Sequence, residues 1–397
     1  MKIVIGCSSP IDQGSGILTY CKNLTLSLKA LGHEILFVSV KSNSYKWFDI
    51  NNILHFESDI NGDVEFEVRN LYLVIRDFNP DVIINNDNCY LQQLAPAIDS
   101  YFIFVLHLSN FVIGELARLN NQYVDRYIAI STDMKFDLVR KFKIPSNKIM
   151  VVLNGLFLSN IAEYNENKKS IESRNNKQIL CAGENSYRKG GDIIIKLFRM
   201  FFNDAKGYHF LWTADADNSV KSKFKKCDFI KIIDKLPKEE FEKTLSSSCF
   251  LLLPSREEGC PMVLLEAMRF GVIPIVSNGK GAMREIVRHG VNGFICDLNN
   301  WCDEVYSILR NPPDDAYLKY MSNNARETFF SSFANNEYAK ELISSIDTTN
   351  DKNLSHEVTL YRWHRLGKSK NIFATLMNKF CYRFGLLIKI RKIKILL

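Results

Sequence analysis

The chain has 397 residues, of which 46% are hydrophobic, so it is long and apolar enough for two globular domains with their own cores. Its ten cysteines form no Cys-x-x-Cys pair, which excludes zinc-finger and disulfide-rich classes and favours free thiols in a reducing compartment. No run of about 18 apolar residues occurs, which excludes a membrane-spanning class. The net charge of +7 comes from residues 358–397, which hold ten Lys and Arg and no acid; the remaining 41 basic and 44 acidic residues do not indicate a nucleic-acid-binding protein.

Short apolar runs separated by helical patterns fill the first 153 residues. The runs predicted as buried parallel strands are KIVIG, EILFVSV, DVIINN, FIFVLH, RYIAIS and KIMVVLN. Apolar residues at helical spacing predict helices between several of them, for example over Ile17–Leu31 and Thr132–Phe142. This alternation is typical of a doubly wound α/β domain, which we place at residues 1–160.

A polar, turn-rich segment at residues 161–177 predicts a linker, after which the alternation resumes over residues 178–346. The predicted strands are QILCAG, YHFLWTA, FIKII, CFLLLP, VIPIVS and GFICD. The predicted helices are PMVLLEAMRF and the segments Lys189–Phe202, Pro237–Ser246, Trp301–Arg310, Ala316–Phe329 and Asn335–Ile346. The sequence thus predicts a second doubly wound domain. Ligands of such sheets bind beyond the carboxyl ends of the strands, so we expect an active site built from loops of both domains.

Two acids mark the helix PMVLLEAMRF, one before it and one inside it. Pro261 suits the first turn of a helix, where its missing N–H has no cost, and Gly271 suits the position just past the end. Glu266 then lies among apolar residues, where a carboxylate needs a partner. Glu258 lies in a loop whose backbone N–H groups, at a helix N-terminus, suit hydroxyls or anions. The alternative is that both acids are solvated surface residues.

The pattern Glu-x7-Glu at Glu258 and Glu266, preceded by Pro-Ser-Arg and followed by A-M-x-x-G-x-x-P-I-V, resembles the signature of retaining glycosyltransferases of family 4. Further similar motifs follow the family's order: GSGILTY, VLHLS, VLNGLF, YRKGGD and GKGAMREIVRHGVNGF. The resemblance covers residues 1–346 and implies the GT-B fold, an α/β architecture of two facing Rossmann-like doubly wound domains. It also implies an acceptor-side first domain and a second domain that binds the donor nucleotide.

The resemblance implies that the basic pair in YRKGGD contacts the diphosphate of a nucleotide-sugar donor. Arg188 and Lys189 would neutralise the charge that develops on the departing diphosphate. Bases at a helix N-terminus oppose its dipole, which favours a specific role over that of ordinary solvated residues. The family often has an arginine directly after the strand's glycine, and that position is Glu184 here, so the division of roles between the two bases stays open.

The resemblance also implies that the loop and first helical turn after CFLLLP bind the donor sugar. The residues concerned are Glu258, Gly259, Cys260, Pro261, Met262 and Val263. Glu266, further along the helix, would bind the ribose hydroxyls.

Three sites in the first domain complete the implied donor-binding set. Gly14-Ser15-Gly16 would let the backbone approach a phosphate, although a plain tight turn is the alternative. His107 ends a predicted strand, where the resemblance implies a role near the donor sugar and the reacting carbon; the alternative is a structural histidine. Asn154 begins the family's Asn-Gly turn before the linker.

The family is normally metal-independent, so we expect no metal and no cofactor beyond the nucleotide-sugar co-substrate. The Asp-x-Asp within residues 214–217 falls where the family has a glycine turn, so we expect an ordinary loop there. The implied reaction is front-face transfer to a hydroxyl acceptor with retention of configuration, in which the protein positions groups and stabilises charge without a carboxylate nucleophile. The implied catalytic residues are His107, Arg188, Lys189 and Glu258.

Residues 347–397 form a basic amphipathic tail that we expect to be helical. Apolar residues recur at helical spacing at Phe373, Leu376, Met377, Phe380, Phe384 and Leu387. A basic amphipathic segment favours binding to a membrane surface; the alternatives are a helix packed on the body and a disordered end. The opening MKIVIGCSSP is interrupted too early for a secretory signal, so we expect a cytoplasmic protein, peripheral at the inner face of the cell membrane.

The predicted activity is therefore that of a hexosyltransferase-type glycosyltransferase in bacterial surface polysaccharide assembly, whether O-antigen, capsule or exopolysaccharide. The expected partners are a nucleotide-sugar donor and a lipid-linked or oligosaccharide acceptor, with no nucleic acid. Two alternatives stay open: a GT-B sugar-nucleotide 2-epimerase and a non-catalytic GT-B scaffold protein. An epimerase would need several acids and a histidine placed for proton abstraction, and a scaffold would not need the intact basic pair and acids.

Overall fold

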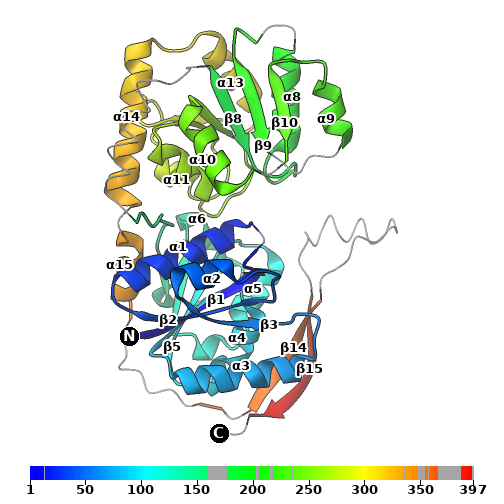
Figure 1. Cartoon of the computed structure of the whole chain (residues 1–397), viewed down its shortest axis with the longest axis vertical. Helices are drawn as coiled ribbons and strands as arrows, with labels where there is room; N and C mark the ends of the chain where they lie inside the picture. The colour runs from blue at the N-terminus through cyan, green and yellow to red at the C-terminus, as the bar shows by residue number, and fades with distance from the viewer. Residues whose placement is uncertain are drawn as a thin grey trace. The chain divides into compact units, whose positions relative to one another are not determined.

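The computed structural model groups the chain into two compact units (Figure 1). The first contains Met1–Asn154 and Tyr338–Leu397, and the second contains Gly155–Glu337. The residues that the structure describes are 1–12, 14–159, 177–202, 205–213, 218–234, 236–334, 336–346, 354–355, 357–364 and 386–395. The predicted linker thus lies almost wholly outside the described residues. The final helix and the C-terminal strands group with the first unit, although the sequence assigned that helix to the second domain.

A seven-stranded parallel sheet forms the centre of the first unit, in the order β3-β2-β1-β4-β5-β6-β7. Its strands are β1 (Lys2–Pro10), β2 (Glu34–Val40), β3 (Leu54–Ser58), β4 (Val82–Asn86), β5 (Tyr101–Leu106), β6 (Arg126–Ala129) and β7 (Ile149–Val151). The strand order reverses between β1 and β4, so the carboxyl ends of these two strands form the topological switch point of the sheet.

Helices connect the strands of this first sheet. They are α1 (Gly16–Ala30), α2 (Lys46–Asn51), α3 (Val64–Phe78), α4 (Cys89–Leu94), α5 (Phe111–Arg118), α6 (Thr132–Arg140) and α15 (Glu337–Ser344), with the 3-10 turns η1 (Ala95–Ala97), η2 (Asn121–Tyr123) and η3 (Ser146–Lys148). Ser15 starts α1 because its hydroxyl accepts a hydrogen bond from the Leu18 N–H at 3.1 Å. β3 and α3 lie between predicted strands at positions where no strand or helix was expected by name.

The second unit contains a six-stranded parallel sheet in the order β10-β9-β8-β11-β12-β13. Its strands are β8 (Gln178–Ala182), β9 (His209–Thr213), β10 (Ile230–Ile233), β11 (Phe250–Leu253), β12 (Ile273–Ser277) and β13 (Phe294–Cys296). Its helices are α8 (Gly191–Phe201), α9 (Asn218–Phe224), α10 (Lys238–Ser247), α11 (Met262–Arg269), α12 (Met283–Ile286), α13 (Trp301–Arg310) and α14 (Asp315–Ser332). This sheet reverses its order between β8 and β11.

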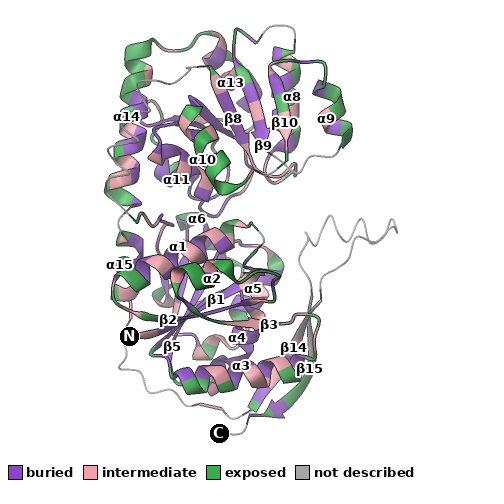
Figure 2. Ribbon diagram, viewed as in Figure 1, coloured by how far each residue is buried: buried purple, intermediate pink, exposed green. Residues whose placement is uncertain are grey.

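Each sheet carries its own hydrophobic core. The central strands are buried and the exposed residues lie mainly on the outer faces of the helices (Figure 2). In the second unit, for example, Phe198 of α8 packs edge-on against Phe210 and Trp212 of β9, with ring centroids 5.5 and 6.0 Å away. The predicted α/β class with two doubly wound parallel sheets is confirmed.

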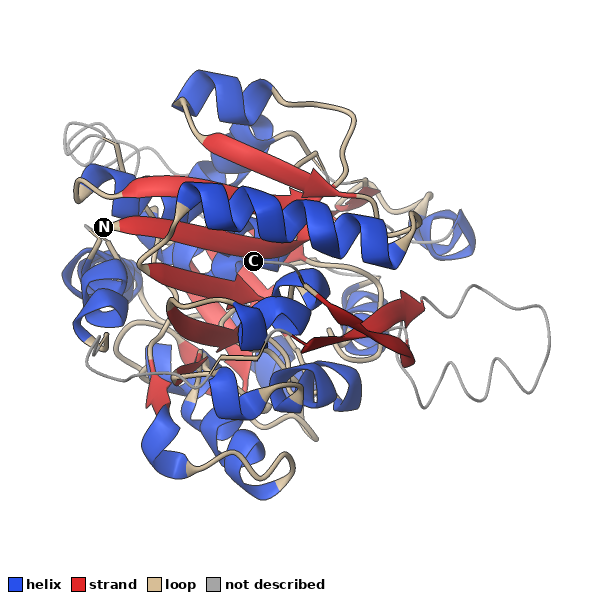
Figure 3. Ribbon diagram, turned by 90° about the horizontal axis from the view of Figure 1, so that it is seen from below, coloured by secondary structure: helices blue, strands red, loops and turns tan. Residues whose placement is uncertain are grey.

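The C-terminal region differs from the helical tail that we expected. β14 (Glu357–His364) and β15 (Leu386–Lys394) pair as an antiparallel two-stranded ribbon, separate from the large sheets (Figure 3). The ribbon packs on α3 and α4. The Gln93 side chain on α4 accepts a hydrogen bond from the Tyr361 N–H at 2.8 Å and donates one to the Tyr361 carbonyl at 3.0 Å. In β15 the buried Ile393 and the exposed Lys392 and Lys394 alternate with the period of two that favours a strand.

The remaining residues of the predicted amphipathic helix, from Phe373 to Phe384, lie outside the described residues, and so does the Asp-x-Asp segment at residues 214–217.

Candidate functional site

Two loops at the switch point of the second sheet, together with α11, hold most of the predicted site residues. One loop follows β8 and contains Arg188 and Lys189, and the other follows β11 and contains Glu258. Because β8 and β11 are parallel neighbours, their carboxyl ends lie at the same edge of the sheet. The structure therefore brings together residues that are about 70 positions apart in the sequence.

The Glu258 carboxylate is the centre of this cluster. Its Oε1 and Oε2 accept hydrogen bonds from Lys189 Nζ at 2.6 and 2.8 Å. Ser255 Oγ donates to Oε1 at 2.7 Å, and an Arg188 nitrogen lies 3.4 Å from Oε2. The Glu258 residue is 5% exposed, so this is a buried, charge-assisted network.

The two cations keep Glu258 ionised. Burial alone would raise the pKa of the Glu258 carboxyl, but the charges of Lys189 and Arg188 and the hydrogen bonds from Lys189 and Ser255 outweigh it. The pKa of Glu258 is therefore lowered. The cluster is a compact arrangement of two positive groups around one negative group, held at a strand-to-helix loop.

Arg256 joins the two loops. Its guanidinium makes two 2.8 Å hydrogen bonds to the Asp192 carboxylate and lies 3.7 Å from the centroid of the Tyr187 ring. Its backbone N–H donates to the Arg188 carbonyl at 2.8 Å. Arg256 was not among the predicted site residues, because its partners Asp192 and Tyr187 are more than 60 positions away and leave no signal in the local sequence.

Two glycines allow the loops to approach this closely. Gly190 has φ +72, and a side chain there would collide with the Pro254 carbonyl oxygen. Gly281 has φ +114, and a side chain there would collide with the carbonyl oxygen of Glu258. The backbone on both sides of the cluster is therefore restricted to glycine at these positions.

The segment after Glu258 leads directly into α11. The Gly259 carbonyl accepts the Ala282 N–H at 2.9 Å, while Cys260 and Met262 are buried. Pro261 is the N-cap residue, one position before the expected first helical turn, and Gly271 follows the helix with φ +69 as predicted.

Glu266 lies on the half-exposed side of α11. Val263 is also half-buried and lies three positions before it, so the two share one helix face. The buried positions of α11 are Met262, Leu264, Leu265, Ala267 and Met268. Glu266 is thus partly covered and not fully buried, because the apolar residues beside it in sequence point to another face.

The predicted residues of the first unit lie at the carboxyl edge of its own sheet. His107 follows β5 and is 6% exposed; its Nε2 lies 3.0 Å from Asn86 Oδ1, and its ring packs edge-on against Tyr20 with centroids 4.8 Å apart. Burial lowers the pKa of His107 to about 3, so the imidazole is neutral. A neutral histidine held by one asparagine can offer a hydrogen bond without adding charge.

The glycine loop and Asn154 occupy different places in this unit. Gly14-Ser15-Gly16 leads into α1, where a Gly16 side chain would meet open space: beyond the chain neighbours and the backbone of α1, no atom of the described residues lies within 4 Å of it. Asn154 is buried and is the last residue of the first segment of this unit.

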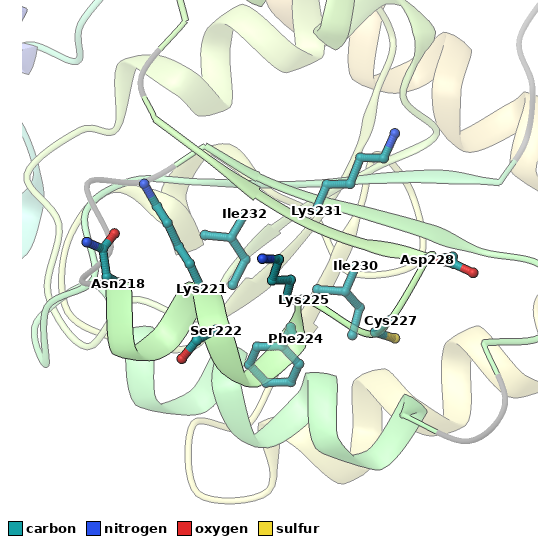
Figure 4. A pocket seen from close by; sticks show the side chains of 10 residues that line it. All are labelled: Asn218, Lys221, Ser222, Phe224, Lys225, Cys227, Asp228, Ile230, Lys231 and Ile232. Carbon is teal, nitrogen blue, oxygen red and sulfur yellow. The ribbon is translucent and has the colours of Figure 1, made fainter.

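A groove of about 480 Å³ lies elsewhere in the second unit, between α9 and the edge strand β10 (Figure 4). Lys221, Lys225 and Lys231 line it together with apolar residues, and it contains none of the predicted site residues.

Within the described ranges, no group of three His, Cys, Asp or Glu side chains could hold a metal ion. No helix among the described residues is both long and apolar enough to cross a membrane.

Two family models match successive parts of the chain. Residues 14–159 match the model described as Glycosyltransferase Family 4, and residues 163–328 match the model described as Glycosyl transferases group 1. The chain belongs to the family 4 glycosyltransferases. The second model ends before α15 and the C-terminal ribbon of this glycosyltransferase, whereas both loops around Glu258 lie inside it.

Relatives and solved structures agree with this family and with the GT-B fold. A Haemophilus influenzae protein named as an uncharacterized glycosyltransferase is 23% identical over 336 residues, which cover 80% of this chain and 92% of the relative. An Escherichia coli UDP-Gal:alpha-D-GlcNAc-diphosphoundecaprenol alpha-1,3-galactosyltransferase is 33% identical over 96 residues, 24% of each chain. Anabaena HepE, solved in complex with UDP and glucose, superposes with a TM-score of 0.70 at 16% identity over 87% of this chain and 99% of HepE.

Proposed function

We propose that this glycosyltransferase moves a hexose-type sugar from a nucleotide-sugar donor to a hydroxyl acceptor with retention of anomeric configuration. The observation that carries the proposal is the buried, ionised Glu258 held by Lys189 and Arg188 at a sheet switch point. Two cations beside a carboxylate provide what a sugar diphosphate needs: positive charge for the phosphates and an acceptor oxygen for sugar hydroxyls.

Lys189 and Arg188 stabilise the departing nucleoside diphosphate in this mechanism. In the structure Glu258 pairs with both cations, and Arg188 also lies 3.9 Å from the Glu184 carboxylate, so two acids balance the two bases. When the diphosphate binds, it competes for the same cations. The Glu258 oxygens can then accept hydrogen bonds from sugar hydroxyls.

The remaining predicted residues complete the donor site in the proposal. Backbone groups of Gly259, Cys260 and Pro261 and the first α11 residues, Met262 and Val263, contact the sugar. Glu266 binds the ribose hydroxyls from its half-exposed helix face. In the first unit, Gly14-Ser15-Gly16 and Asn154 contact the donor, and the neutral His107 lies near the reacting carbon.

The reaction that this set supports is front-face displacement. The acceptor oxygen forms a bond to the anomeric carbon as the bond from that carbon to the phosphate oxygen breaks. The departing phosphate oxygen takes the acceptor proton, so no carboxylate nucleophile is needed. The residues contribute by orientation and by charge stabilisation in a site that excludes water.

The proposed biological setting is bacterial surface polysaccharide assembly with a UDP-sugar donor and a lipid-linked or oligosaccharide acceptor. The name of the E. coli relative includes a UDP-galactose donor and a diphosphoundecaprenol acceptor, and HepE was solved with UDP and glucose. We also propose that the basic C-terminal region binds the inner face of the cell membrane. Lys392 and Lys394 are exposed on β15, where they are available to anionic headgroups.

The deciding experiment combines a panel of nucleotide sugars with product analysis. Bases and sugars are varied separately, release of the nucleoside diphosphate is measured, and the anomeric configuration of the product is assigned by NMR. We expect turnover of at least one donor with retention, and loss of it in Glu258→Gln. Glu257→Gln changes the neighbouring carboxylate, whose side chain is 39% exposed, and serves as the matched control. An inverted product, or no turnover across the panel, contradicts the proposal.

A further inference from the structure

Asp87 is a buried acid for which the described part of the chain provides no hydrogen-bond partner. It directly follows β4, and its side chain lies below the surface at 3% exposure. Both carboxyl oxygens are buried without a partner within the described residues. Burying a carboxyl group without a partner is energetically costly, so such a group needs an explanation.

The neighbouring asparagines are engaged elsewhere. Asn86 donates from Nδ2 to the Gly6 carbonyl at 2.9 Å, and Asn88 donates from Nδ2 to the Cys7 carbonyl at 3.1 Å. These bonds join the ends of β4 and β1. Asp87 lies between the two asparagines in sequence, and no described residue forms a hydrogen bond with its carboxyl group.

The backbone of Asp87 is also in an uncommon conformation. Its φ of +57 is in the left-handed region, which glycine adopts without cost and which asparagine and aspartate tolerate better than other residues. An uncommon backbone conformation and an unpartnered buried acid at one residue are typical of a site where function outweighs stability.

The position of Asp87 is that of a ligand contact. It lies at the carboxyl end of β4, at the switch point between β1 and β4, where open α/β sheets bind their ligands. The Oδ1 atom of the preceding residue, Asn86, accepts a hydrogen bond from His107 Nε2 at 3.0 Å. Asp87 and His107 are thus linked through one side chain and one peptide bond.

One titratable neighbour of Asp87 is the buried thiol of Cys21 on α1, whose pKa is raised by burial, by Cys7 and, to a smaller extent, by the charge of Asp87. Burial raises the pKa of Asp87 to about 8, so at neutral pH it is largely a protonated carboxylic acid. A protonated acid donates one hydrogen bond and accepts others, which complements an alcohol hydroxyl.

We propose that Asp87 binds a hydroxyl group of the sugar substrate at the carboxyl edge of the first sheet. This inference rests on the proposed function, because it assumes a saccharide ligand. The hydroxyl belongs either to the acceptor saccharide or to the donor sugar, and the experiment has one arm for each.

The binding experiment compares the full-length wild type, Asp87→Asn and Asp137→Asn by ligand-observed NMR titration at pH 7. Asp137 is also buried, but it is paired with Lys141 at 3.1 Å, so it is a matched control outside the site. The probes are a panel of methyl glycosides for the acceptor arm and UDP-glucose and UDP-galactose, each compared with UDP, for the donor arm.

Asparagine, like a protonated acid, still donates and accepts hydrogen bonds, so Asp87→Gly is included because it removes both groups and suits the positive φ. We expect Asp87→Gly to weaken one class of probe at least tenfold while UDP binding is unchanged. Equal affinities in Asp87→Gly and wild type overturn the inference, and so does a wild type that binds neither glycoside nor the sugar part of the UDP-sugars. A wild type that binds a glycoside through Asp87 but transfers no sugar contradicts only the proposed function. Normal transfer by Asp87→Gly contradicts only the role of Asp87.

A second measurement tests the structural premise without any ligand. The pKa of a buried, unpartnered Asp87 is raised on folding, so the folded state binds a proton that the unfolded state releases between about pH 4 and 8. The melting temperature of the wild type should fall over this range more steeply than that of Asp87→Asn, which should melt higher at pH 8. Identical pH profiles overturn the premise. Asp87→Gly replaces Asp87→Asn in this measurement if the asparagine variant does not fold.

Discussion

Lys189 Nζ lies within 2.8 Å of both carboxylate oxygens of Glu258, although 69 positions separate the two residues. One group was expected at the diphosphate and the other at the sugar. In the structure they form an ion pair, which the proposed mechanism exchanges for contacts with the donor when the donor binds.

Replacing Lys189 with alanine should affect both turnover and stability. Turnover should fall by about 100-fold or more, because a preorganised positive group at the departing phosphate is lost. The free energy of unfolding should fall by about 1–3 kcal/mol, because Glu258 keeps only Arg188 and Ser255 as partners. Steady-state kinetics and urea unfolding measure the two effects. Lys196→Ala, at an exposed position of α8, is the control, and near-normal turnover of Lys189→Ala would refute the phosphate role.

The pH dependence of stability should contain a contribution from Glu258. Burial opposes ionisation of this group, but Lys189 and Arg188 prevail and lower its pKa below the ordinary 4.5. The stabilisation is therefore complete above about pH 4.5 and is lost as the pH falls through the folded pKa. Urea unfolding from pH 3 to 7 should show that Glu258→Gln is less stable than wild type at pH 7 and that the difference narrows in acid. A difference that is constant with pH contradicts this assignment.

Arg256→Lys should loosen the connection between the two loops without removing a group from the proposed donor contacts. Lysine keeps the charge but cannot make the paired bonds to Asp192 or stack on Tyr187 in the same way. Because Asp192 is half exposed, we expect a stability loss of only about 1 kcal/mol. The KM for donor should rise by about fivefold with a smaller change in kcat, since misplaced loops bind donor less well.

The test of this connection is a double-mutant cycle with Asp192→Asn. Residues that act through one contact give non-additive effects, so the double variant should resemble either single variant. Additive losses of donor affinity would show that Arg256 does not act through Asp192.

Glu266→Ala should weaken nucleotide binding and leave stability almost unchanged. Its half-exposed position on α11 predicts a stability change within about 0.5 kcal/mol. Loss of hydrogen bonds to the ribose should weaken UDP binding by about tenfold, as measured by calorimetry. Glu239→Ala on α10 is an exposed control, and an unchanged UDP affinity of Glu266→Ala contradicts the ribose role.

Membrane binding by the tail is best tested by reversing charges rather than by deletion. Removing residues 358–397 would take away Val358 and Leu360, which are buried in the ribbon, and would therefore disturb the first unit. Lys392→Glu with Lys394→Glu changes exposed residues only. The double variant should sediment less with anionic liposomes than wild type, and neither should bind neutral liposomes. Equal sedimentation with anionic liposomes contradicts the proposal.

The local hydrophobic pattern of the sequence was sufficient to predict most helices and strands of the two large units, but it was insufficient for the C-terminal tail. Helix α13 has the predicted limits Trp301–Arg310, and α11 ends before Gly271 as its sequence indicates. The tail was expected to be helical because Phe373 to Phe384 follow helical spacing, but its flanking segments pair with each other across residues 365–385. Pairing between distant segments leaves only a weak period-two signal in each, so helical spacing was the more visible pattern.

The sequence by itself determined that this protein has two parallel α/β sheets and that Arg188, Lys189, Glu258 and Glu266 are the residues to examine. The two sheets follow from the local hydrophobic period, whereas the four residues follow from motifs that resemble those of the family. Only the tertiary structure decided that Glu258 is ion-paired with Lys189, that Arg256 joins the two loops and that Asp87 is buried without a described partner. Each of these depends on which loops meet at the carboxyl edge of a sheet. Strand order determines which loops are neighbours, and long-range packing determines strand order.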